Sequence, residues 1–141
     1  MQTALLRLVA TLGFFVLVSF APARADEVEG QAHVLIQRQL DAFARGDAAG
    51  AYALAAPGIK VIFPNSGVFM DMARTRYAPV YHHRSADFGT FKRDGDNASQ
   101  DLTIVDDDNQ VWTAIYKLTL QPDGSWLISG CVLIKSEAKS V

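Results

Sequence analysis

The feature that most constrains the fold is a change in the spacing of apolar residues at about residue 85. Before this point apolar residues recur every three or four positions, as they do along one side of an α-helix. After it they alternate with period two, which is typical of β-strands, and Asp, Asn, Gly and Pro separate the alternating stretches. We therefore predict helices first and an antiparallel meander second, an α+β fold in which the helices pack on a curved sheet.

The first half of the chain divides into short elements. An apolar stripe predicts a helix over residues 26–45, with Gly46 as its stop. A second, alanine-rich helix is expected over 48–56. Residues 59–63 alternate and predict a short strand, and a third helix is expected over 68–76.

The second half predicts four strands, over residues 85–93, 98–106, 111–121 and 125–135. On the last strand the alternation predicts that one face is shared by Trp126, Ile128, Gly130, Val132 and Ile134. The opposite face of the last two strands is also partly apolar. In a sheet with one face in water, apolar and polar residues alternate more regularly. We therefore expect the second face to be covered by a curl of the sheet or by another subunit, as in a homodimer through the sheet.

The first 25 residues have the three-part layout of a secretory signal. Arg7 is followed by an apolar run over 8–20 and then by the small-residue pattern Ala23-Arg24-Ala25, which predicts cleavage after Ala25. This leaves residues 26–141 as a single domain in the periplasm or outside the cell. Without Arg7 and Arg24, the net charge becomes two units more negative than the −2 of the whole chain. The remaining charges are interspersed, so we expect no nucleic acid and, after cleavage, no membrane as a partner.

Several short motifs, in this order, resemble a known family. They are Gln39-Leu40-Asp41-Ala42-Phe43, Asp47, Ala55-Ala56-Pro57, Trp112 ahead of Tyr116, and the run from Asp123 to Cys131. Their spacing is similar to that of the domain of unknown function 4864, a family of exported bacterial proteins, and more broadly to the nuclear-transport-factor-like superfold. The resemblance covers essentially all of residues 26–141. It implies a bent sheet wrapped around a long helix, forming a cone with a pocket at its open end, and it carries no assigned activity.

In such a cone, six polar or aromatic side chains are candidates for contact with a ligand: Gln39, Tyr77, Tyr81, Arg84, Trp112 and Tyr116. Gln39 stands on the apolar stripe of the first helix, where an amide without partners costs about 1–3 kcal/mol. The four aromatic residues would give a mainly apolar pocket with a few hydrogen-bonding groups. The alternative interpretation is a core amide bonded to backbone, ordinary aromatic packing and a solvated arginine.

Other groups that carry chemistry do not form a site in the sequence. His82 and His83 are neighbours on an extended segment and point to opposite faces, while zinc needs three or four converging ligands. Cys131 lies among apolar neighbours and is predicted to be a buried, inert thiol rather than a nucleophile. We therefore predict no metal, no cofactor and no catalytic residue.

Three functions are left open by these observations. The leading one is a binding module of the bacterial envelope that holds a small, largely apolar ligand or a protein partner. The second is an enzyme resembling ketosteroid isomerase or the polyketide cyclases, which abstract a proton with a carboxylate or histidine base. The candidate bases Asp41, Asp71 and Asp101 are all expected to face away from a pocket. The third is a structural dimer without a pocket, with its sheets packed face to face.

Overall fold

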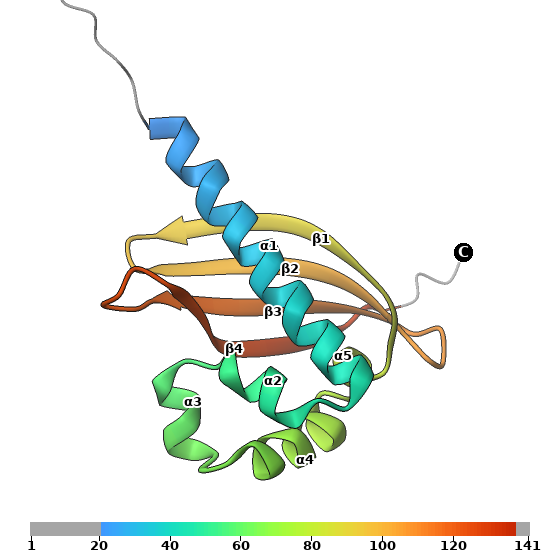
Figure 1. The fold of residues 1–141 in the computed structure, drawn as a ribbon. Helices are drawn as coiled ribbons and strands as arrows, with labels where there is room; N and C mark the ends of the chain where they lie inside the picture. The colour runs from blue at the N-terminus through green and yellow to red at the C-terminus, as the bar shows by residue number, and fades with distance from the viewer. Residues whose placement is uncertain (1–20, 138–141) are drawn as a thin grey trace, which may run out of the picture.

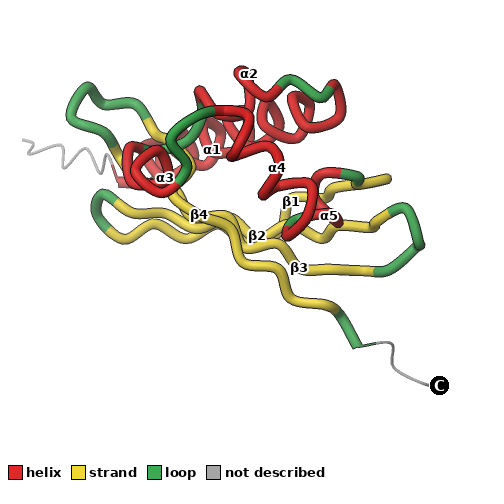
Figure 2. Tube along the Cα trace, turned by 90° about the horizontal axis from the view of Figure 1, so that it is seen from below, coloured by secondary structure: helices red, strands yellow, loops and turns green. Residues whose placement is uncertain are grey.

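The fold is a layer of helices on one face of an antiparallel sheet (Figures 1 and 2). The computed structural model describes the backbone of residues 21–137 and the side chains of 24–137. Its elements are α1 (Ala21–Arg45), α2 (Ala48–Ala53), α3 (Pro57–Ile62), α4 (Ser66–Arg76), α5 (Ala78–Tyr81), β1 (His83–Asp94), β2 (Asn97–Asp106), β3 (Val111–Leu120) and β4 (Trp126–Lys135). The strands stand in the order β1-β2-β3-β4, so β1 and β4 are the edges of an open sheet. The α+β prediction is confirmed.

Helix α1 lies across the inner face of the sheet and supplies much of the core (Figure 1). Its buried residues follow the predicted apolar stripe: Val28, Ala32, Leu35, Ile36, Gln39, Leu40, Ala42 and Phe43. Gly46 ends the helix with a φ of +66°, a conformation that costs glycine little. Asp47 then caps α2 by accepting a hydrogen bond from the backbone N–H of Gly50 at 2.9 Å.

The predicted strand over residues 59–63 is wrong, because most of this segment belongs to α3. Pro57 stands in the first turn of this helix, where its fixed φ suits a helix and its missing N–H is not needed. The N–H of Ile59 donates to the carbonyl of Ala56 at 3.0 Å. Of the β-branched residues that suggested a strand, Val61 and Ile62 are exposed, whereas Ile59 packs against the core. Backbone pairing with the sheet is made by Ala55 in an isolated parallel bridge to Ile128.

The prediction for the faces of the fourth strand is also wrong, and the reason is a β-bulge. Lys117 pairs with Gly130, but the next residue of β3, Leu118, pairs with Ile128. Ser129 is therefore one residue too many in β4, and an extra residue reverses the alternation of everything beyond it.

Beyond the bulge, Cys131 and Leu133 pair with inward residues of β3 and face the helices. Val132 and Ile134 turn to the outer face, where both are exposed together with Val111 of β3. The homodimer through this outer face stays a prediction.

The predicted signal segment lies mostly outside the described residues, since the description begins at Ala21. Among the side chains that the structure describes, the first buried one in α1 is Val28, so cleavage after Ala25 would remove none of the described core. No helix within residues 21–137 combines the length and the apolar character that a membrane crossing requires.

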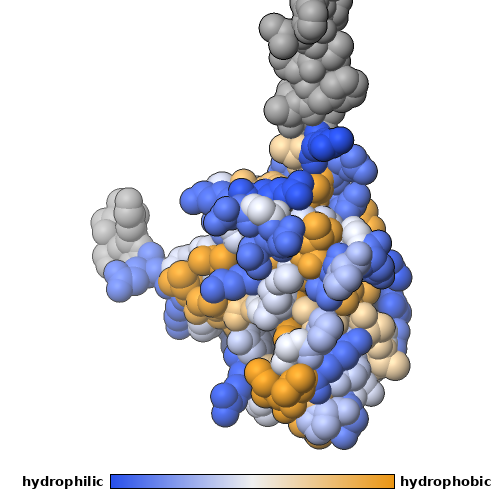
Figure 3. Space-filling model, turned by 90° about the vertical axis from the view of Figure 1, so that its left-hand side faces the viewer, coloured by the Kyte–Doolittle hydropathy of each residue, from blue (hydrophilic) through white to orange (hydrophobic). Residues whose placement is uncertain are grey.

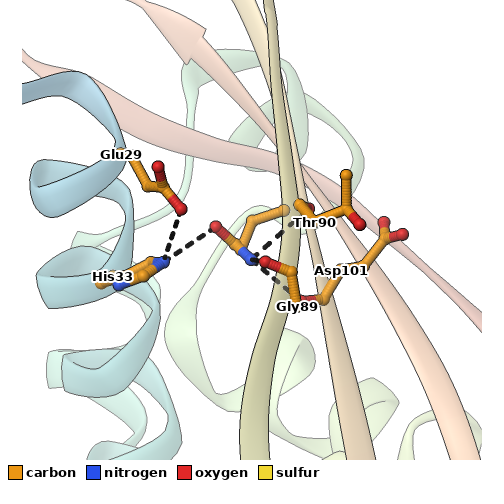
Figure 4. Close-up of polar contacts among 6 residues, drawn as sticks. Glu29, His33, Gly89, Thr90 and Asp101 are labelled. Carbon is orange, nitrogen blue, oxygen red and sulfur yellow. Dashed lines mark hydrogen bonds and ion pairs between the residues drawn. The ribbon is translucent and has the colours of Figure 1, made fainter. Parts of the chain in front are cut away.

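One of two bulges in β1 is held to α1 by the buried side chain of Gln100, which bonds to His33 and Gly89 (Figure 4). The register shifts between Phe88 and Phe91, which leaves the carbonyls at the bulge without regular ladder partners. The amide nitrogen of Gln100 donates to the carbonyls of Gly89 at 3.1 Å and Asp101 at 2.9 Å.

The other end of the Gln100 amide reaches α1. Its oxygen lies 3.0 Å from Nε2 of His33, and since the amide nitrogen already donates, His33 Nε2 must carry the proton. The same nitrogen lies 3.6 Å from a carboxylate oxygen of Glu29, and the imidazole stacks on Phe88 with ring centroids 4.2 Å apart. This network fixes α1 against β1 and β2.

Replacing Gln100 with leucine should lower the free energy of unfolding by about 2–4 kcal/mol, because the buried groups that bond to this amide would lose their hydrogen bonds. Urea unfolding followed by circular dichroism measures this. Gln110→Leu, at an exposed position, is the matched control and should change the value by less than about 0.5 kcal/mol. Equal stability of the Gln100 variant and the wild type would contradict the role given to this network.

Candidate functional site

A cavity of about 270 Å³ opens between the helices and the β4 edge of the sheet. Its apolar wall comes from α1, α3, α4, α5 and β4: Phe43, Ile59, Phe63, Phe69, Met72, Val80 and Ile128. The volume is just below the roughly 300 Å³ at which pockets for drug-sized ligands begin. A water occupies about 30 Å³ of liquid, so the cavity has room for about nine waters or a ligand of about ten non-hydrogen atoms.

Gln39 brings an amide to this cavity from the middle of α1. Its side chain is only 3% exposed, and it lines the cavity. Among the described residues no hydrogen-bond partner is found for this amide, yet no fully enclosed side-chain nitrogen or oxygen is left unpaired. Its polar atoms must therefore keep some solvent contact, and the cavity that Gln39 lines is where this contact can be made.

Tyr116 of β3 brings a second polar group, a hydroxyl, to the cavity. The residue is 1% exposed and lines the same cavity, and its hydroxyl also has no hydrogen-bond partner among residues 24–137. Burial raises the pKa of Tyr116 well above its ordinary value, and the neighbouring Cys131 and Tyr77 raise it further. The hydroxyl therefore stays protonated and remains a hydrogen-bond donor.

Tyr77, the residue that follows α4, reaches across the cavity to β4. Its hydroxyl donates to the carbonyl oxygen of Cys131 at 3.0 Å, so only its lone pairs remain for a ligand. Burial and Cys131 raise the pKa of this phenol, and Arg76 partly offsets the rise. Arg76 and Ser129 are exposed at the rim of the cavity, where Arg76 is its only charged lining residue in the described chain.

The bulge at Ser129 brings Cys131 to the cavity. Without the extra residue this side chain would face outward, as the alternation of β4 predicted. Burial raises the pKa of the thiol to about 12, so at neutral pH it is uncharged and a poor nucleophile. The prediction of an inert thiol agrees with this pKa, whereas its place in the cavity wall was not predicted.

Three of the six candidate residues, Gln39, Tyr77 and Tyr116, meet at this cavity. The other three do not line it. Tyr81 packs against Phe43 with ring centroids 5.7 Å apart, behind the cavity wall.

Arg84 and Trp112 are engaged elsewhere, in the hairpin that joins β2 and β3. Arg84 donates to the side-chain oxygen of Asn109 at 2.6 Å. The indole N–H of Trp112 donates to Asp106 at 2.8 Å, and Lys135 lies over its ring. These contacts hold the hairpin and its neighbours, and both residues lie outside the lining of this cavity.

The cavity lacks a general base in the part of the chain that the structure describes. No carboxylate or histidine is among its lining residues. Asp41 and Asp71 are exposed on the helices, and Asp101 faces outward opposite Ile115. The polar groups that the described residues bring to the cavity are therefore an amide, two phenols and a thiol, with a hydroxyl and a guanidinium at the rim.

The neighbouring histidines His82 and His83 are also separated. His82 is exposed beside the Tyr81 ring, and Nδ1 of His83 bonds the carbonyl of Val80 at 2.8 Å. Within residues 21–137 no three His, Cys, Asp or Glu side chains come together in a way that could hold a metal ion.

The raised thiol pKa predicts how stability responds to alkali. An unfolded thiol ionises near its ordinary value of 9.0, whereas the folded one keeps its proton until about pH 12. The unfolded state therefore gains the free energy of ionisation first, and stability should fall by up to about 1.4 kcal/mol per pH unit above pH 9. Urea unfolding at pH 8, 9 and 10 should show this fall in the wild type and a flatter profile in Cys131→Ala. Parallel profiles would contradict the assignment.

Comparison with known proteins gives a family but no function. No curated protein matches the chain. The model of one protein family matches residues 25–141, and this family is described as a domain of unknown function (DUF4864). This range contains every residue of the cavity. The chain therefore belongs to the DUF4864 family.

Proposed function

We propose that this protein is an exported binding module whose cavity takes a small, uncharged, largely apolar molecule with a hydrogen-bond acceptor such as a carbonyl. The observation that carries the proposal is the open amide of Gln39 inside a largely apolar wall. An amide open to the cavity can bond to water there, and a ligand with an acceptor can take the place of that water. Packing alone gives no reason for a glutamine at this position.

The chemistry of the wall supports an uncharged ligand. Arg76 is the only charged lining residue among those described, and it stands at the rim. An ion in the interior would lose its hydration without a counter-charge, which costs several kcal/mol. A carbonyl oxygen, in contrast, can accept from the Gln39 amide or from the protonated Tyr116 hydroxyl.

Binding is favoured over proton abstraction for a specific reason. The cavity has one free phenol donor, Tyr116, of the kind that a ketosteroid-isomerase-like site would use, but none of its described lining residues is a carboxylate or histidine. Such chemistry needs a base within about 3 Å of the proton it removes. The donors alone are sufficient to hold and orient a ligand.

Export and the cone-shaped superfold are parts of the same proposal. The family match begins at residue 25, beside the proposed cleavage point, and the first described core residue comes after it. The long α1 laid across a bulged sheet, with an opening near one edge, supports the nuclear-transport-factor-like arrangement (Figure 1). The observed sheet itself is open and four-stranded.

The test compares two probes that differ only by a carbonyl in place of a methylene group, the bicyclic ketone 1-tetralone and its parent hydrocarbon tetralin. Calorimetry should show that the wild type prefers the ketone and that Gln39→Leu weakens ketone binding about tenfold or more, because one hydrogen bond to a buried partner is lost. Tetralin binding should be unchanged or tighter in the variant, since leucine adds apolar surface. No binding of the ketone, or equal binding by both proteins, would refute the proposal.

Stability supplies a control that separates a ligand-binding amide from a structural one. Gln39→Leu should leave the free energy of unfolding unchanged or higher, because no internal hydrogen bond is lost. A loss of about 2–4 kcal/mol, as expected for the fully bonded Gln100, would instead identify Gln39 as a structural core residue.

A further inference from the structure

The mouth of the cavity carries apolar side chains that the fold does not bury. Val61 of α3 is 84% exposed and Ile62 is 70% exposed, while Val68 at the start of α4 is 44% exposed. No residue of α3 is fully buried. Figure 3 looks onto the side of the molecule where α3 lies, and apolar residues stand out at its lower end. We call Val61, Ile62 and Val68 the mouth patch.

The mouth patch is continuous with the inside of the cavity. Ile62 belongs to both, since it is exposed and also lines the cavity. Its neighbours Ile59 and Phe63 line the cavity as well. An apolar molecule can thus pass from the outside of α3 to the interior along apolar surface.

Basic side chains stand beside the patch. Lys60 belongs to α3, and its ammonium lies 5.3 Å from the centre of the Tyr52 ring. Arg76 is at the rim of the cavity. The ion pairs found within residues 24–137 involve neither of them, whereas the acidic group closest in sequence to the patch, Asp71, pairs with Arg74 at 2.6 Å. The mouth is therefore locally basic on a chain whose net charge is −2.

We propose that the mouth patch docks on an anionic lipid bilayer, from which the cavity takes a lipophilic ligand. Apolar side chains flanked by basic ones are the combination that suits the interface of an anionic membrane. This inference rests on the proposed function, because it supplies the source of the ligand. It departs from the expectation, drawn from overall charge, that no membrane is a partner.

The size of the patch favours a bilayer over a protein. Each of its side chains exposes on the order of 100 Å², so three of them offer about 300 Å². A stable protein interface needs about 800 Å² from each partner. A few apolar side chains are, in contrast, enough for a weak and reversible contact with a membrane.

Sedimentation with phosphatidylethanolamine and phosphatidylglycerol vesicles tests the proposal. The wild type should bind them and should bind phosphatidylcholine vesicles at least threefold more weakly, because the basic rim then has no anionic surface to meet. Val61→Asp with Val68→Asp should reduce binding to the anionic vesicles about tenfold. Neither position lines the cavity, so both leave the ligand wall intact.

The matched control is Val34→Asp, since Val34 is 60% exposed on α1 and away from the mouth. It should bind vesicles like the wild type. Absence of wild-type binding, or equal binding by the double variant, would overturn the proposal. So would a change from dimer to monomer in the double variant with unaltered vesicle binding, because a second copy would then cover the patch. Should the double variant not fold, Val61→Asn should reduce binding about threefold.

Binding of 1-tetralone from solution separates this inference from the proposed function. The double variant should bind this ketone as the wild type does. Ketone binding without vesicle binding would refute only the docking surface, whereas vesicle binding without ketone binding would refute the cavity as a ligand site.

Discussion

The arrangement of this protein depends on extra residues in the two edge strands of its sheet, two in β1 and one in β4. The bulge at Ser129 reverses the alternation of β4, and the bulge after Phe88 does the same in β1. Bulges bend strands and strengthen their twist, which lets a sheet follow the surface of a helix packed on it. Here that helix is α1, and the space that it leaves uncovered beside β4 is the cavity.

Two buried glutamines, each near a bulge, differ in whether their amide groups have hydrogen-bond partners within the fold. Gln100 satisfies the carbonyls of the β1 bulge and reaches His33, so its burial is compensated by hydrogen bonds. Gln39 is buried almost as deeply but opens into the cavity near the β4 bulge. Natural proteins depart from full satisfaction of buried polar groups mainly where function requires it. This contrast is the physical basis for placing the binding site at Gln39.

Much of the fold could be predicted because its apolar spacing is regular. The stripe of α1 and the alternation of β1–β3 each identify one element type. The bulge at Ser129 could not be predicted, because β4 is apolar on both faces and a shift of one residue leaves the pattern looking the same. The strand predicted over residues 59–63 was wrong for another reason. Their β-branched side chains favour a strand, whereas Pro57 and the contact of Ala55 with Ile128 place most of the segment in a helix.

The site was predicted only in part. Gln39 was recognisable as a polar residue on an apolar stripe, and this position alone required an explanation. Trp112 and Tyr81 could not be told apart from Tyr77 and Tyr116, because aromatic character does not say where a side chain points. The partners that engage Trp112 and Arg84, Asp106 and Asn109, belong to a turn whose geometry the sequence does not specify.

The most direct test of the account is the behaviour of the two side-chain amides in solution. Nitrogen–proton spectra of the labelled protein in the absence of ligand should show protected amide protons for Gln100 and rapidly exchanging ones for Gln39. Addition of 1-tetralone should shift the resonances of Gln39 and slow their exchange, while those of Gln100 stay in place. Protected Gln39 protons in the free protein, unmoved by the ketone, would mean that this amide is an ordinary part of the core and would contradict the account.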